Sequence, residues 1–272
     1  MRPAIPLAML LAAVTSASAG ESVVTLPEGI VGTLSLPEGG AEGPAVVMLH
    51  GFASARDEVG DLFAAQAASL AEAGIASLRI DFRGYGESAG AEAEVTIERM
   101  LEDAALAHDY LAAVDGVDAA RVGALGYSFG AAIAMLGQEE HAAIAVWGQM
   151  GDLRGEFVEF LGQEAFDAAA ETGTYAVDLG WRAITLDRPF FESLTRHDLA
   201  AAFAGFDRPF LTIAGEHDPA AGHLDRFVSL TEGEARAVVV PGTDHMFGAL
   251  SGAPEIVASL VAQTTVWFAA NL

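Results

Sequence analysis

The fold of this chain is restricted above all by an alternation of short apolar runs with longer amphipathic segments. The runs that we interpret as strands are 22–26, 31–36, 45–49, 75–80, 121–126, 142–147, 209–214 and 235–240. Apolar residues recur at helical spacing in the segments 61–73, 96–114, 129–136 and 255–271. Continuous apolar strands separated by helices are typical of parallel sheets that are buried on both faces. The pattern therefore predicts an α/β fold with a mostly parallel sheet of about eight strands and helices on both faces.

One stretch interrupts this alternation. About 60 residues, 148–207, separate two predicted strands, whereas a single crossover helix needs roughly half as many. The stretch holds nine of the 22 aromatic residues of the chain. We interpret it as a helical cap inserted over the carboxyl edge of the sheet; an ordinary helix with a long surface excursion is the alternative. The sequence shows no repeat and no low-complexity linker, so we expect one domain, 20–272, that contains this insertion.

The composition excludes several classes of protein. The chain carries 38 acidic and 13 basic residues, for a net charge of −25, and every basic residue is arginine. Such an acidic protein repels the phosphates of nucleic acids, so we expect no nucleic-acid partner. There is no cysteine, which rules out disulfides, cysteine-ligated zinc and thiol nucleophiles. Hydrophobic residues make up 52% of the chain, which favours a globular fold over disorder.

The first residues have the features of a targeting signal. Arg2 precedes an apolar run, 4–14, and the small residues Ala17-Ser18-Ala19 follow it. This order is typical of a secretory signal peptide, here 1–19, with cleavage after Ala19. The run is shorter than the roughly 20 apolar residues that span a bilayer. We therefore expect a secreted or periplasmic protein without a stable membrane anchor after cleavage; a buried helix or a membrane anchor is the alternative interpretation.

The pentapeptide GYSFG at 126–130 is the strongest local motif. It joins a predicted strand to a predicted helix, where a sharp turn forces the central residue into a strained conformation and presents its side chain above the sheet. Gly126 and Gly130 avoid the Cβ atoms that would collide in such a turn. Since the helix N-terminus favours negative charge, we predict Ser128 as a nucleophile rather than as part of a simple packing turn.

A serine nucleophile needs a base and an acid that orients the base. Of the seven histidines, His245 lies in the loop after the strand 235–240, at the carboxyl edge of the sheet. We predict His245 as the base and Asp218, which follows the strand 209–214, as the acid. Glu216 is a lesser candidate for the acid, and Asp152 occupies the loop after the preceding strand. Asp244 is disfavoured because neighbouring side chains point in different directions.

A tetrahedral oxyanion requires two converging N–H donors. The backbone N–H of Phe129, directly after the nucleophile, is one candidate. The second is the N–H of Phe52, in the turn after the strand 45–49. As residues that bind substrate we predict Trp147, Trp181 and Phe247, although core packing is an equally good interpretation of each.

Taken together, the motifs resemble those of the α/β-hydrolase superfamily over residues 45–268. The matching segments are HGF at 50–52, DFRGYGES at 81–88, GYSFG at 126–130, GEHD at 215–218 and DHMF at 244–247. Within the superfamily the chain is similar to the dienelactone-hydrolase-like and feruloyl- or cinnamoyl-esterase-like branches. Those esterases often continue the acid loop as Asp-x-x-Val-Pro, whereas this chain has DPAA at 218–221. The resemblance implies an α/β-hydrolase fold and a triad in the order Ser128, Asp218, His245.

From these residues and this resemblance, the sequence predicts a serine hydrolase that cleaves a small-molecule carboxylic ester through an acyl-enzyme, without a metal or an organic cofactor. A peptidase or an acyltransferase would use the same triad, so both stay open. A non-catalytic binding protein with a hydrolase fold is the alternative from another class. The oligomeric state and the acyl and alcohol groups of the substrate are not determined by the sequence.

Overall fold

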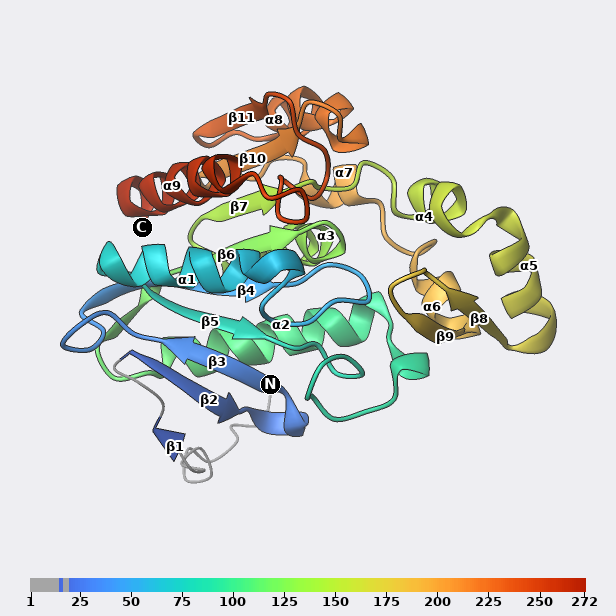
Figure 1. Ribbon diagram of the computed structural model, residues 1–272, viewed down its shortest axis with the longest axis horizontal. Helices are drawn as coiled ribbons and strands as arrows, with labels where there is room; N and C mark the ends of the chain where they lie inside the picture. The colour runs from blue at the N-terminus through green and yellow to red at the C-terminus, as the bar shows by residue number, and fades with distance from the viewer. Residues whose placement is uncertain (1–14, 17–19) are drawn as a thin grey trace.

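Nine strands form one sheet in a computed structural model that describes residues 15–16 and 20–272 (Figure 1). The order across the sheet is β1-β2-β3-β5-β4-β6-β7-β10-β11. Six neighbouring strands run parallel to one another, namely β5, β4, β6, β7, β10 and β11, whereas β1, β2 and β3 add an antiparallel edge. The bounds of the strands are β1 (Thr15–Ser16), β2 (Glu21–Thr25), β3 (Val31–Ser35), β4 (Gly43–Leu49), β5 (Ala76–Ile80), β6 (Val117–Tyr127), β7 (Ile144–Trp147), β10 (Phe210–Gly215) and β11 (Ala235–Val240).

Helices cover both faces of this sheet. They are α1 (Leu62–Glu72), α2 (Ile97–Ala112), α3 (Phe129–Leu136), α8 (Leu224–Leu230) and α9 (Pro254–Asn271), to which the insertion described below adds four more. Figure 1 shows α9 in red beside α1, and the two helices contact each other on one face. The helices α2 and α3 contact the sheet and each other on the other face.

The central strand β4 explains why both faces are covered. Its residues point alternately to opposite sides: Val46 and Met48 belong to the core under α1 and α9, whereas Val47 belongs to the core under α2 and α3. All three are fully buried. A strand that is apolar on both faces is stable only between two layers of helices. The prediction of a mostly parallel sheet with helices on both faces is therefore confirmed.

The order of the strands places a crevice at one point of the sheet. After β4 the chain continues through α1 to β5 on one side, and then returns through α2 to β6 on the other side of β4. The loops that leave β4 and β6 therefore diverge at the carboxyl edge of the sheet. In open α/β sheets, ligands bind at such a switch point.

The segment between β7 and β10 contains helices and a small second sheet. Its elements are α4 (Leu153–Leu161), α5 (Gln163–Thr172), β8 (Thr174–Asp178), β9 (Ala183–Asp187), α6 (Arg188–Ser193) and α7 (Leu199–Phe203). The strands β8 and β9 pair as an antiparallel hairpin, which the helical interpretation of this segment had not anticipated. The alternation of its side chains was the available signal, since Ile184 and Leu186 are buried between exposed neighbours. In Figure 1 this hairpin lies with α5 and α6 beyond the edge to which the parallel strands point.

The predicted signal peptide, 1–19, lies outside the described residues except for Thr15 and Ser16. None of the helices in the described part of the chain combines the length and the apolar character that crossing a bilayer requires.

Candidate active site

Ser128 occupies the sharp turn between β6 and α3. Its backbone has φ 54° and ψ −115°, a strained conformation for a residue with a Cβ atom. Its N–H donates to the Trp147 carbonyl oxygen of β7 at 2.8 Å. The turn depends on the flanking glycines: a Cβ on Gly126 would lie 2.5 Å from the Ala131 Cα atom, and a Cβ on Gly130 would overlap the carbonyl oxygen of Leu49. The helix α3 therefore begins in close contact with the carboxyl end of β4, and Ser128 lies at the crevice.

His245 and Asp218 form a pair beside this turn. His245 Nδ1 lies 2.8 Å from Asp218 Oδ2, and the side chain of Asp218 is almost completely buried while that of His245 is partly exposed. The other carboxylate oxygen, Oδ1, accepts the N–H of Ala220 at 2.9 Å and caps the 3-10 turn that follows β10. Asp218 is thus held by one oxygen and orients His245 with the other. This leaves His245 Nε2 as the ring nitrogen available for a proton transfer.

Tyr127 and Gly148 support this pair. The Tyr127 hydroxyl donates to the His245 carbonyl oxygen at 2.8 Å, and the two rings stack with centroids 5.1 Å apart. Burial raises the pKa of Tyr127 well above its ordinary value, so the hydroxyl stays a donor. Gly148 has φ +56°, and a Cβ there would lie 2.7 Å from His245 Cε1 and 3.0 Å from Asp218 Oδ2. Sequence reasoning missed both residues, although a glycine directly after a buried strand is a recognisable signal.

The other candidates for the acid have other partners. Asp152 is exposed at the start of α4, where its N–H donates to Glu156 Oε1. Glu216 Oε2 accepts the N–H of Gly242, and Asp244 Oδ1 accepts the N–H of Met246. In the described part of the chain, only Asp218 is recorded in contact with the His245 ring nitrogens.

The loop after β4 contributes the second predicted N–H donor. His50 is fully buried, and its Nε2 accepts the N–H of Phe82 at 3.1 Å while its Nδ1 lies 2.8 Å from the Gly51 carbonyl oxygen. Burial lowers the pKa of His50 to about 4, so the ring is neutral and can bridge these groups. Within the described residues, the N–H groups of Phe52 and Phe129 donate to no protein acceptor. Both are therefore available to a ligand.

A cavity of about 760 Å³ brings these residues together. Its lining includes Ser128, His245, Asp218, Phe52 and Phe129. Aromatic side chains of the inserted segment form much of the remaining wall, notably Phe157 and Phe160 from α4 and Trp181 from the turn between β8 and β9. The mouth is apolar, since Phe160, Trp181 and Leu250 line the cavity and are 52%, 66% and 72% exposed.

Two of the predicted substrate-binding residues lie elsewhere. Trp147 is fully buried in the core under α1 and α9, where its Nε1 donates to Thr264 at 2.9 Å. Phe247 is buried against it, with ring centroids 6.4 Å apart. Neither residue is part of the cavity lining, contrary to the prediction. Phe157 and Phe160 line the cavity instead. Trp181 does line it.

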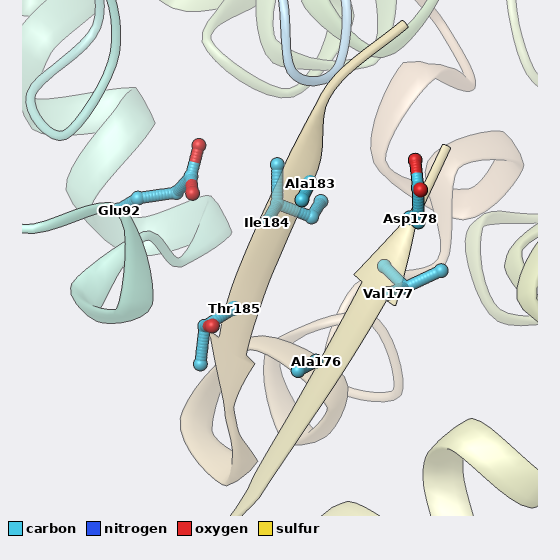
Figure 2. Close-up of a pocket in the computed structure, with 7 residues that line it drawn as sticks. All are labelled: Glu92, Ala176, Val177, Asp178, Ala183, Ile184 and Thr185. Carbon is cyan, nitrogen blue, oxygen red and sulfur yellow. The ribbon is translucent and has the colours of Figure 1, made fainter. Parts of the chain in front are cut away.

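A second cavity, of about 320 Å³, lies between the β8–β9 hairpin and Glu92 (Figure 2). Figure 2 shows its lining to be alanine, valine, isoleucine and threonine side chains, with the carboxylates of Glu92 and Asp178. Glu92 pairs with Arg182 at 2.5 Å. The lining contains no histidine and no serine, so we assign the chemistry to the larger cavity. No group of three or more potential metal ligands occurs among the described residues.

Comparisons with known proteins agree with the fold described above. The sequence model described as "Alpha/beta hydrolase family" matches residues 46–260. An uncharacterized protein of Mycobacterium tuberculosis is 31% identical over 213 residues, which are 76% of this chain and 64% of the relative. The chain therefore spans less than two thirds of the length of that relative. An uncharacterized 31.7 kDa protein of Escherichia coli is 32% identical over 105 residues, 39% of this chain and 36% of the relative.

Solved structures share the fold at low sequence identity. The structure of DcsB with its substrate analogue has a TM-score of 0.74 at 16% identity and covers 93% of this chain and 100% of its own. Est1E of Butyrivibrio proteoclasticus with bound ferulic acid has a TM-score of 0.69 at 19% identity, with coverage of 90% and 97%. The dienelactone hydrolase of Anabaena variabilis has a TM-score of 0.62 at 20% identity, with coverage of 93% and 98%.

Proposed function

The chain belongs to the alpha/beta hydrolase family, and from this premise we propose that it is a serine hydrolase that cleaves carboxylic esters through an acyl-enzyme. The observation that carries the proposal is the His245–Asp218 pair at 2.8 Å, in one cavity with a serine held in a strained turn. This set of groups is the one that nucleophilic acyl transfer needs. The order Ser128, Asp218, His245 along the chain is also the order of the family.

In the proposed reaction, His245 Nε2 accepts the proton of the Ser128 hydroxyl as the Ser128 oxygen attacks the ester carbonyl. Asp218 keeps the imidazole in the Nδ1–H tautomer and stabilises the imidazolium that forms. The same His245 then donates the proton to the leaving alcohol as the acyl-enzyme forms. In the second half of the reaction it activates a water molecule, which hydrolyses the acyl-enzyme and releases the acid.

The N–H groups of Phe52 and Phe129 stabilise the oxyanion in this proposal. Neither is recorded donating a hydrogen bond to another described residue, and both residues line the cavity with Ser128. A donor aimed at the developing charge is typically worth about 100- to 1,000-fold in kcat. The N-terminus of α3 adds a favourable partial charge at the same place.

The shape of the cavity favours an ester with a bulky apolar group. The walls contain Phe52, Phe157 and Phe160, with Trp181 at the mouth. Est1E, which shares the fold, has been solved with ferulic acid, an aromatic carboxylic acid. We therefore propose an aromatic or extended apolar acyl group. The chemistry needs no metal and no organic cofactor, so activity should persist in the presence of a chelator.

The decisive experiment compares Ser128→Ala with Ser229→Ala, a serine on α8 that lines neither cavity. Turnover of p-nitrophenyl butyrate and labelling by a fluorophosphonate probe should vanish in Ser128→Ala and persist in Ser229→Ala. Retained turnover in Ser128→Ala would refute the proposal. A parallel panel of amides and acyl acceptors separates an esterase from a peptidase or an acyltransferase. Absence of labelling in the wild type would point to a binding protein.

We also propose export through the segment 1–19. The segment has the order of a basic start, an apolar run and small residues that signal peptidases require. Expression of the full chain in a bacterial host, followed by N-terminal sequencing of the periplasmic or extracellular protein, should give a chain that starts at Gly20. A full-length chain that stays inside the cell would refute this.

A further inference from the structure

A half-buried carboxylate, that of Glu58, spans the loop that carries Phe52. Glu58 Oε1 accepts the N–H of Gly51 at 2.6 Å, and Oε2 accepts the N–H of Val59 at 2.7 Å. One oxygen thus binds the second residue of the loop after β4, and the other binds the residue next to Glu58 itself. Hydrogen bonds to a charged acceptor are stronger than neutral ones. The carboxylate therefore ties the beginning of this loop to its end.

This carboxylate lies close to the nucleophile. A Cβ built on Gly51 would be 3.2 Å from Glu58 Oε1 and 3.3 Å from Ser128 Cβ. Because both atoms are that close to one point, they are at most the sum of the two distances, 6.5 Å, apart. Glu58 also lines the cavity that contains Ser128 and His245.

The loop has few other internal restraints. Of the backbone N–H groups of residues 51–55, only that of Gly51 is recorded as a donor within the described part of the chain, and its acceptor is Glu58. The loop is also strained, since Ala53 has φ 55° and Glu58 has φ 62°. Such conformations persist only when the surroundings hold them. The restraints on either side of Phe52 are the bond from the Gly51 N–H to Glu58, the contact of the Gly51 carbonyl oxygen with His50 Nδ1 at 2.8 Å and the bond from Arg182 to the Ala53 carbonyl oxygen.

The groups around Glu58 favour its carboxylate as a hydrogen-bond acceptor. Burial raises the pKa of the Glu58 carboxyl above its ordinary value, while the hydrogen bonds of Gly51, Val59 and the Ser54 side chain and the charge of His245 act in the opposite direction. The neighbouring acid Asp57 is engaged elsewhere, because its Oδ1 lies 2.6 Å from Arg79 Nε. Arg56 is bound to Asp81 and Glu87. The bonds of Glu58 to Gly51 and Val59, together with the one to the Ser54 side chain, are therefore the contacts through which Glu58 acts on the loop.

We propose that Glu58 is a positioning residue that holds the Gly51–Phe52 backbone so that the Phe52 N–H points at the oxyanion. The inference rests on the proposed function, because it assigns a partner to that same oxyanion site. In this role Glu58 acts through the backbone of Gly51. The charge of Glu58 also favours the imidazolium of His245, which forms in the same step.

Three variants test this role. Glu58→Ala removes both acceptors, whereas Glu58→Gln keeps the shape and one carbonyl oxygen for the Gly51 N–H. Glu72→Ala is the matched control, because Glu72 is an exposed glutamate at the end of α1 that lines neither cavity. The measurements are kcat and KM for p-nitrophenyl butyrate, the inhibition constant of an alkyl boronic acid that mimics the tetrahedral intermediate, and Tm.

We expect kcat of Glu58→Ala to fall about 100-fold, the loss typical of one oxyanion donor, with KM changed less than threefold. Boronic acid affinity should fall in parallel with kcat. Glu58→Gln should show a smaller loss of both, and Glu72→Ala should behave as the wild type. The parallel loss separates positioning from a purely structural role, which would lower Tm without a matching loss of boronic acid affinity.

An active, Ser128-dependent wild type whose Glu58→Ala variant folds and keeps kcat within threefold overturns the inference alone. A wild type without Ser128-dependent turnover overturns both the inference and the proposed function. If Glu58→Ala fails to fold, Glu58→Gln decides: equal kcat and boronic acid affinity to the wild type overturn the inference.

Discussion

Replacing Gly148 by alanine tests whether the His245–Asp218 pair performs the proposed chemistry. Gly148 follows β7 directly and has φ +56°, and an added Cβ would lie 2.7 Å from His245 Cε1. Ordinary van der Waals contact begins near 3.4 Å, so the His245 ring must move by about 0.7 Å. The same Cβ would also lie 3.0 Å from Asp218 Oδ2. The His245 ring therefore cannot move away and keep its present hydrogen bond to Asp218.

The magnitude follows from this displacement. A misplacement of about 1 Å in a catalytic group can cost about 100-fold in rate. We therefore expect kcat of Gly148→Ala to fall about 30- to 100-fold, a loss of about 2 to 3 kcal/mol in transition-state stabilisation. The left-handed backbone conformation adds a separate cost of about 1–2 kcal/mol in folding free energy, which any residue other than glycine incurs there.

The control separates these two effects. Gly205 has φ +81°, and a Cβ there would meet no atom within 4 Å. Gly205→Ala should therefore lose a similar amount of stability and keep its kcat. The assays are p-nitrophenyl butyrate hydrolysis and the midpoint of urea unfolding. The reasoning is refuted if Gly148→Ala folds and keeps kcat within threefold, or if Gly205→Ala loses as much kcat as Gly148→Ala.

Further outcomes can be checked with the same assays. Asp218→Asn should lower kcat about 10,000-fold while Oδ1 still caps the turn at Ala220; a loss below tenfold would exclude Asp218 as the orienting acid. Tyr127→Phe should cost about 1 kcal/mol in unfolding free energy and a few-fold in kcat, because it removes the hydroxyl bond to His245 but keeps the stacked ring; unchanged values would refute this. Burial lowers the pKa of His50 to about 4 and that of His141 to about 3, so each favours its neutral form in the folded state. The contribution of these two neutral histidines to the free energy of unfolding is fully present above pH 6.5 and is lost as the pH falls toward their folded-state pKa values. The urea midpoint should therefore fall from pH 7.5 to pH 5, and less so in His141→Phe; an unchanged midpoint would contradict this.

The buried strands and the sharp turn at GYSFG could be predicted because each depends on local patterns. Strands that are apolar on both faces require two layers of helices wherever they occur, and β4 satisfies this with alternate residues in two cores. The turn at Ser128 needs glycine on both sides for steric reasons that involve only nearby backbone. Such constraints act within a few residues, so the sequence displays them directly.

The sequence left the surroundings of Trp147 and Trp181 undetermined, because these depend on the direction in which each side chain points. Trp147 and Trp181 looked equivalent as aromatic residues in the second half of the chain. Trp147 lies on a strand with two buried faces, and the parity of β7 directs it to the core under α1 and α9. Trp181 lies at the turn of a hairpin that reaches the mouth of the cavity. Apolar character alone does not distinguish these two surroundings.

The sequence by itself determined the class of fold, the residue at the strained turn and the short set of acids and histidines that follow the parallel strands. Only the tertiary structure decided which acid contacts His245, since Asp218, Asp152 and Glu216 all follow strands that end at the same edge. It also placed the Glu58 carboxylate against the Gly51 N–H, a contact that no recognisable motif around Glu58 indicates. Both choices depend on how loops from separate strands meet, and that distance is set by the packing of the whole sheet rather than by any local pattern.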